Sequence, residues 1–244
     1  MALETTRPAF YALRSGGWRD YFTLLHIPYT AWHLSYVAIG AALTAEFSWS
    51  RLLPTMAAFF LAVGIGAHAL DEVNGRPLRT EIPQGVLYLL AATSIAGAVA
   101  IGVVGAITVD PWIGLFVVAG AFVVVAYNLE SFAGRFHSDA WFALSWGAFP
   151  LLTGYFAAAE RMGAVALVGA VFAFALSLAQ RILSTQVRDM RRRVVRVHGT
   201  VERADGTSSE LTVEAVMGPA ERALRVLSVA VVALALALVM MRAW

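Results

Sequence analysis

The sequence predicts an all-α integral membrane protein, a single domain over residues 1–244 in which about seven spanning helices form a bundle. Composition is the first indication, since 59% of the residues are hydrophobic, 14% are charged and the mean hydropathy is +0.71. Soluble domains are about 45–50% apolar and about 25% charged. A series of long apolar stretches is the second indication, and the arginine-rich segments between them are the third.

Seven stretches approach the roughly 20 apolar residues that cross a bilayer. They are 24–45, 52–70, 86–108, 112–128, 140–159, 163–183 and 223–241. Short polar turns such as SWSR, TVDPW and AAERMG separate several of them, as in a compact helical bundle. Small residues recur within the stretches, for example in VGIGA and AGAVAIG, and they let helices approach one another closely.

The basic residues are distributed unequally around these stretches. All 18 are arginine, and if the spans alternate in direction only Arg51, Arg161 and Arg242 fall on one side. Cytoplasmic loops carry the excess of basic residues in membrane proteins. The sequence therefore predicts the cytoplasmic (inner) membrane, with a cytoplasmic N-terminus. This topology accounts for the arginines, and the net charge is only +2, so no nucleic-acid partner is predicted.

Several kinds of chemistry are excluded by the residues that the chain lacks. It has no cysteine, which excludes disulfides and a thiol nucleophile. It has no lysine, which excludes a Schiff-base mechanism. Its glycine runs VGIG and GVVG lie inside apolar stretches, where they indicate helix packing and not a phosphate-binding loop.

One polar insertion, residues 194–219, separates the last two spans. It contains an Asp205-Gly206 pair with alternating apolar residues before it (Val195, Val197, Val201) and further apolar residues after it (Leu211, Val213, Val216). Such a pair between alternating residues favours a tight turn between two strands. We expect a small cytoplasmic β-hairpin, which could serve as a lid, a docking surface or a connector.

Polar residues gather in three clusters at the predicted cytoplasmic ends of spans. The first cluster is His68, Asp71, Glu72, Asn74, Arg76 and Arg79; the second is Tyr127, Asn128, Glu130, Arg135, His137 and Asp139; the third is Gln180, Arg181, Ser184, Arg188 and Asp189. Ionisable groups within membrane helices are costly and normally face a cavity or one another. We therefore expect one shared pocket that opens to the cytoplasm. The run Arg191–Arg193 is expected to anchor the helix end near anionic lipid.

The first cluster also carries a resemblance to a known family. The helix that ends near Asp71, the segment NGRPLRTEIP and the apolar span after it resemble the UbiA superfamily of intramembrane prenyltransferases. The early stretch LLHIPYTAWHLSYVAIGAAL is similar to that family's first span, and the resemblance covers roughly residues 20–190. Ala67, His68 and Gly75 stand where the family's first motif has Asn, Asp and Asp, so only Asp71 keeps its identity.

The resemblance implies a UbiA-like bundle that binds an isoprenyl diphosphate with Mg²⁺. By this comparison Asp71, Glu72 and His68 are catalytic, and Asp71, Glu72 and Asp189 hold the metal. The substrate is contacted by Asn74, Arg76, Arg79, Tyr127, Asn128, Gln180, Arg181, Ser184 and Arg188. The prenyl chain is expected beside Phe132, Phe142 and Trp146, whose aromatic faces can stabilise an allylic cation.

Two other functions stay open at this stage. A transition metal could be held by His68, Glu130, His137 and Asp139, because a mixture of imidazole and carboxylate suits Zn, Mn or Fe better than Mg. A non-catalytic membrane subunit that binds a lipid or a quinone is the third possibility, since few acidic residues of the family's motifs are kept. The sequence names no protein partner.

Overall fold

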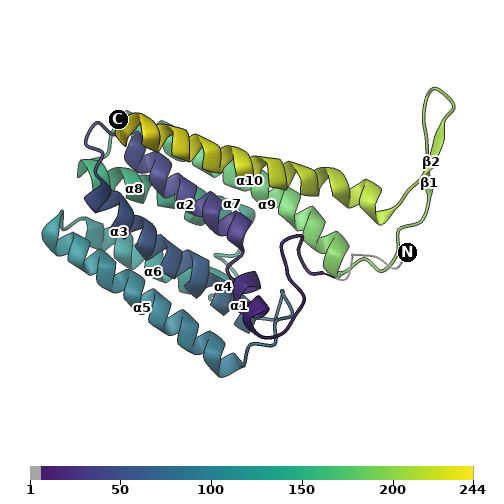
Figure 1. The fold of residues 1–244 in the computed structure, drawn as a ribbon, viewed down its shortest axis with the longest axis horizontal. Coiled ribbons are helices and arrows are strands. Elements are labelled where there is room, and N and C mark those ends of the chain that lie inside the picture. Colours follow the sequence, from purple (N-terminus) through teal and green to yellow (C-terminus); the bar gives the residue numbers. More distant parts are fainter. Residues whose placement is uncertain (1–6, 244) are drawn as a thin grey trace.

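The computed structural model describes residues 7–243, and within them the chain is mostly helical (Figure 1). Five helices are long and apolar enough to cross a membrane: Trp49–Val73, Gln84–Thr108, Asp139–Ala159, Ala164–Arg192 and Val213–Arg242. Many of their large apolar side chains point outward, such as Ile107 on α5 and Val168 on α9, which are 78% and 71% exposed. An outer surface of this kind is suited to contact with lipid.

Two of these five helices contain a π-helical segment. The helix Trp49–Val73 consists of α3 (Trp49–Phe59), η2 (Phe60–Ala67) and α4 (His68–Val73). The helix Asp139–Ala159 consists of α7 (Asp139–Ala143), η3 (Leu144–Ala148) and α8 (Phe149–Ala159). A π segment widens the turn by one residue and is frequent at functional sites. The others are α5 (Gln84–Thr108), α9 (Ala164–Arg192) and α10 (Val213–Ala243).

The first predicted span is shorter than expected. Residues 24–45 do not form one helix, because the chain breaks at His26, which has a φ of 46°. The short α1 (Trp18–Leu24) ends before it, and α2 (Ile27–Ala42) begins after it with Pro28 in its first turn, a position that proline favours. With 16 residues, α2 is below the length of a typical span, as is α6 (Ile113–Asn128).

The bundle is organised around α2, which is largely buried and packs against α8, α10 and α3. Two glycines bring α2 and α8 into backbone contact. A Cβ added to Gly40 would overlap the carbonyl of Leu151, and one added to Gly154 would overlap the carbonyl of Val37. Close approach of this kind needs small residues at both faces, as in many membrane bundles.

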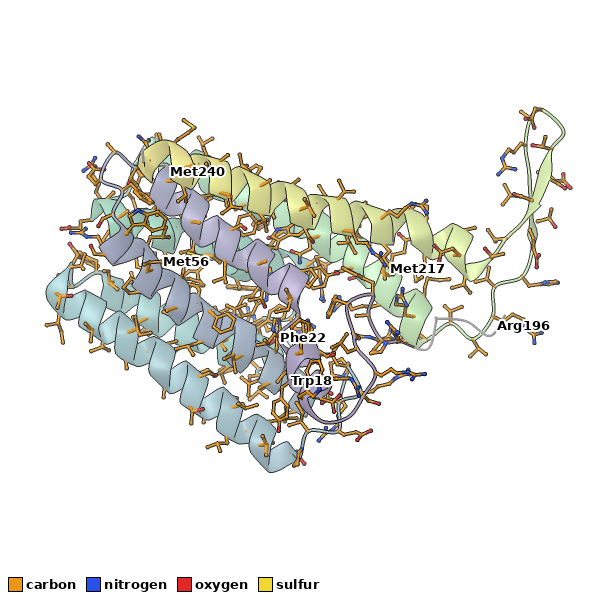
Figure 2. The ribbon with its side chains drawn as sticks, in the orientation of Figure 1. Trp18, Phe22, Met56, Arg196, Met217 and Met240 are labelled. Carbon is orange, nitrogen blue, oxygen red and sulfur yellow. The ribbon has the colours of Figure 1, made fainter. Side chains whose placement is uncertain are left out.

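The last two helices, α9 and α10, lie side by side and extend beyond the rest of the bundle (Figure 1). Met217 lies on this extension (Figure 2) and packs with Val187 and Leu224 in a small apolar cluster. We call this end of the molecule the hairpin end, because the β-hairpin projects from it. It also carries α1, whose Trp18 and Phe22 are exposed (Figure 2).

The extension is held by a buried ion pair that sequence reasoning did not anticipate. Arg191 donates from Nε to Glu221 Oε2 at 2.9 Å, and both side chains are only 9% exposed. Arg225, one turn further along α10, contacts the other oxygen of Glu221. Arg191 was expected to anchor the helix in lipid headgroups, but its guanidinium joins α9 to α10 because Glu221 lies opposite it.

The predicted hairpin is present. Strands β1 (Thr200–Glu202) and β2 (Ser208–Glu210) pair antiparallel, with Val201 opposite Ser209. Gly206 takes a φ of 83° in the turn, and Asp205 Oδ1 accepts from the Thr207 amide at 2.9 Å. Both are common devices of tight turns.

The second half of the insertion differs from the prediction. Val213 and Val216 were expected to continue the hairpin, but residues 213–219 already belong to α10. Thr212 accepts a hydrogen bond from the Ala215 amide and so caps the start of this helix. The burial of Met217, Ala220 and Leu224 follows helical spacing, so packing against α9 outweighs the strand pattern.

The α2–α8 contact leads to a first prediction. Gly154→Ala should lower the free energy of unfolding by about 1–3 kcal/mol or more, because its methyl group would force two backbones apart. Thermal unfolding of the purified protein in detergent measures this. Gly85→Ala is the control, since nothing lies within 4 Å of a Cβ built there; it should be neutral or stabilise α5 by up to about 1 kcal/mol. Equal effects of the two substitutions would contradict the tight contact.

Candidate functional site

A cavity of about 110 Å³ lies at the hairpin end of the bundle. Its walls are formed by residues of α2, η2, α4, α6, η3 and α9. The segment Pro8–Tyr11 lines one further side. We call it the polar cavity. Members of all three predicted clusters line it: His68 and Asp71 of the first, Tyr127, Asn128 and His137 of the second, and Gln180, Arg181, Ser184 and Arg188 of the third. Phe142 and Trp146, which were expected beside the prenyl chain, also line it. The fold thus brings together residues that lie more than 100 positions apart.

Glu72, which was expected to bind metal, lies outside this cavity. Its side chain is fully buried, and both carboxylate oxygens accept hydrogen bonds from the loop between α4 and α5. Oε2 accepts from the Leu78 amide at 2.9 Å, and Oε1 accepts from the amide and the hydroxyl of Thr80 at 2.8 Å each. Glu72 therefore holds the loop, and its oxygens are already occupied.

Other residues of the first cluster are also structural. Arg76 donates to the carbonyls of Thr80 and Ile82 at 2.8 Å each. Asn74 donates to the carbonyl of Asn128 at 3.2 Å and so joins α4 to the end of α6. Arg79 has a φ of 56° and is exposed on the loop. Asn74, Arg76 and Arg79 are not among the described residues that line the polar cavity.

The remaining predicted metal ligands do not meet one another. Asp189 is half exposed and lies 3.8 Å from Arg193. Glu130 is exposed beyond the end of α6, and Asp139 pairs with Arg181 at 3.0 Å. His137 donates from Nδ1 to the carbonyl of Tyr127 at 3.0 Å. In the described part of the chain, residues 7–243, no group of three or more His, Asp or Glu side chains could hold a metal ion.

Two histidines stack against each other at the wall of the polar cavity. The rings of His26 and His68 are 3.9 Å apart and nearly parallel, with 10° between their planes. His68 donates from Nδ1 to the carbonyl of Gly64 in η2 at 3.2 Å, which leaves its Nε2 as an acceptor. The Tyr11 hydroxyl lies 3.0 Å from His26 Nδ1. Imidazole is the better acceptor of the two, so the phenol donates and the His26 proton lies on Nε2.

Sequence reasoning missed His26, Tyr11 and Arg192, which all line the cavity. Tyr11 lies in a segment with no regular secondary structure, and its position depends on the tertiary fold. His26 lies outside the three predicted clusters in the sequence. Arg192 was assigned to lipid contact with its two neighbours, although helical spacing of four residues places it on the same face of α9 as Arg188.

Three arginines and one carboxylate line the polar cavity: Arg181, Arg188, Arg192 and Asp71. Arg181 pairs with Asp139 and lies over the ring of Phe142, 5.3 Å from its centre. Arg188 donates only to Ser184 O and Thr185 Oγ1. Among residues 7–243, neither Arg188 nor Arg192 forms an ion pair, and the same is true of Asp71. The wall is therefore basic and only partly neutralised.

A second, larger hollow lies further along the same helices. This apolar groove has a volume of about 610 Å³ and lies between α3, α5, α6 and α8. Phe59, Phe116, Gly120 and Phe149 are among its lining residues. Val124, which is buried in one apolar cluster with Trp146, lies on α6 between the residues that line the groove and those that line the polar cavity. The chain thus has a polar site at the hairpin end and an apolar one deeper in the bundle.

Comparison of this chain with protein families, with curated proteins and with solved structures finds no match.

The two adjacent acids of α4, Asp71 and Glu72, lead to different predictions for the free energy of unfolding. Glu72→Gln should lower the free energy of unfolding by about 2–4 kcal/mol, because its amide group would face an N–H donor without accepting from it. Asp71→Asn should change it by less than about 1 kcal/mol, since no ion pair involving Asp71 is broken. Chemical unfolding in detergent measures both. Similar losses would contradict the structural role of Glu72.

The position of His26 predicts a pH dependence. Burial, and then the nearby His68, Arg192 and Arg188, hold the pKa of His26 well below the usual 6.5. Below pH 6.5 the unfolded chain therefore gains a proton that the folded chain does not, and stability falls by up to about 1.4 kcal/mol per pH unit. Unfolding measured between pH 7.5 and 5.5 tests this. His26→Gln should show a flatter pH profile; an unchanged slope would contradict the assignment.

Proposed function

We propose that this protein is a UbiA-like intramembrane prenyltransferase that binds an isoprenyl diphosphate in the polar cavity. In this proposal α2 and α6 also span the bilayer, which gives about seven spans in the cytoplasmic membrane. The hairpin end, with most of the arginines and the N-terminus, faces the cytoplasm. The positive-inside bias of the sequence supports this orientation, and the order of spans and polar segments over residues 20–190 supports the family resemblance.

The observation that carries the proposal is the basic, partly enclosed cavity with aromatic walls. A diphosphate is a concentrated negative charge, and guanidinium groups bind phosphate oxygens well, often through two parallel hydrogen bonds. Arg188 and Arg192 line the cavity, and among residues 7–243 no carboxylate forms an ion pair with either of them. Tyr127, Phe142 and Trp146 line the same space, where their ring faces suit the cation of an ionising allylic group.

The geometry suggests how these residues would act on such a substrate. When the allylic C–O bond breaks, the diphosphate leaves with the electron pair and its negative charge increases. Arginines fixed beside it stabilise that charge, and preorganised charges of this kind are the largest contribution to many enzymatic rates. The apolar groove of about 610 Å³ is suited to a hydrocarbon chain. The acceptor of the prenyl group is not identified by any residue.

The magnesium site that the resemblance implies does not fit the residues present. Mg²⁺ needs oxygen ligands in near-octahedral geometry, with carboxylates and phosphate oxygens among them. The Glu72 oxygens are occupied by Leu78 and Thr80, and Asp189 lies outside the cavity. Asp71 is the single carboxylate that lines it among residues 7–243. A transition-metal site fares no better, because within residues 7–243 no group of three or more His, Asp or Glu side chains could hold a metal ion.

A second function is favoured by one observation. The apolar groove is larger than the polar cavity and is lined mainly by aliphatic and aromatic side chains. A non-catalytic subunit that binds a lipid or a quinone would need such a groove and would need no metal. The two functions differ in turnover, because only the transferase releases inorganic diphosphate when an acceptor is supplied.

Binding to the purified protein in nanodiscs tests the proposal. Farnesyl and geranylgeranyl diphosphate should bind saturably, and Arg188→Gln should weaken this binding by roughly tenfold or more, because it removes a cation from a desolvated site. Arg193→Gln is the matched control on the same helix, since its side chain is 84% exposed and lies outside the cavity. Release of diphosphate is then measured with membrane extracts as the source of acceptor. No saturable binding of either compound would refute the proposal.

A further inference from the structure

We infer that the polar cavity binds the phosphate oxygens of its ligand by direct contact with arginines and neutral hydrogen-bond donors, without a divalent cation. This inference rests on the proposed function for the identity of the ligand as a diphosphate ester. It departs from what the family resemblance implies, and three features of the cavity carry it.

The first feature is the balance of charge. Among residues 7–243, Arg181, Arg188 and Arg192 line the cavity together with one carboxylate, that of Asp71. Arg181 is neutralised by Asp139 at 3.0 Å. Unpaired charges away from water are costly, so an anionic ligand would stabilise Arg188 and Arg192 where they stand. A divalent cation beside Arg188 and Arg192 would instead be repelled.

The second feature is a set of polar atoms without partners. Within residues 7–243 the buried side-chain atoms that make no hydrogen bond are His26 Nε2, Tyr127 Oη, Gln180 Oε1 and Arg192 Nε. All four residues line this one cavity. Gln180 is only 2% exposed and Tyr127 only 5%. Buried polar atoms normally have partners, so four unpaired ones around a single cavity point to a polar ligand.

The third feature is that most of these atoms are donors. With the Tyr11 hydroxyl donating to His26 Nδ1 at 3.0 Å, the imidazole proton lies on Nε2, which has no partner among the described residues. Arg192 Nε carries a hydrogen, and the Tyr127 hydroxyl can donate its own. The amide of Gln180 can present its NH₂ group by rotation. Phosphate oxygens accept such bonds, whereas a metal ion needs acceptors as ligands.

Asp71 makes the inference testable, because the two modes of binding predict opposite signs. If Asp71 holds a metal ion, Asp71→Asn must weaken binding. If the anion meets the arginines directly, removing this one negative charge must strengthen binding, by roughly two- to tenfold. The substitution breaks no ion pair among the described residues, and circular dichroism verifies that the variant is folded.

The experiment titrates the full-length protein in nanodiscs with inorganic diphosphate and with farnesyl diphosphate, each in EDTA and in Mg²⁺. We expect both to bind in EDTA, with farnesyl diphosphate the tighter of the two and with Mg²⁺ giving no gain in affinity. Arg192→Gln should weaken both by roughly tenfold or more, and Arg193→Gln should leave both unchanged. Binding only in Mg²⁺, or weaker binding by Asp71→Asn, would overturn the inference.

The outcomes also separate this inference from the proposed function. If inorganic diphosphate binds in EDTA and farnesyl diphosphate binds no more tightly, the anion site stands and the prenyl substrate is refuted. If farnesyl diphosphate binds only with Mg²⁺, the proposed function stands and the metal-free site is refuted. If neither ligand binds under either condition, both are refuted.

Discussion

The buried carboxylate of Glu72 is the interaction on which the hairpin end of the molecule depends. In a low-dielectric interior an acid must find several donors, and Glu72 finds three in the loop after α4. The loop in turn supports the start of the chain: Leu78 packs against Ala9 and Ala12, and the Glu81 amide donates to Asp20 at 2.8 Å. This N-terminal segment supplies Tyr11 to the polar cavity, so one carboxylate indirectly closes the site.

The same constraint separates the charges of this end into two groups. Glu72, Arg76, Arg191 and Glu221 are satisfied by partners within the fold and hold loops and helices together. Arg188 and Arg192 have no carboxylate partner among residues 7–243, and neither does Asp71. Because pairing is the normal state of buried charge, the second group is where a ligand is expected. The arginines of this end therefore have two roles: some hold the fold together through ion pairs and hydrogen bonds, and others form the basic wall of the polar cavity.

Much of this could be predicted from the sequence, and the limits are instructive. Hydropathy located the long helices, the Asp205-Gly206 pair located the hairpin, and the spacing of Gln180, Ser184 and Arg188 placed them on one face of α9, where all three line the cavity. Reasoning by cluster also assigned Glu72, Asn74 and Arg76 to the pocket, whereas the structure places them outside the cavity lining. A helical period cannot say which of two adjacent side chains faces a cavity, since they project about 100° apart.

The sequence by itself determined that the chain is apolar, helical and suited to a membrane, and that its polar chemistry gathers at one end. Those properties follow from the composition and from the order of apolar and polar segments along the chain. Only the tertiary structure decided which charges are paired, because pairing depends on residues far apart in the chain. Arg191 meets Glu221 across 30 positions, and Tyr11 meets His26 across 15. The structure thus distinguishes residues that build the cavity from those that line it.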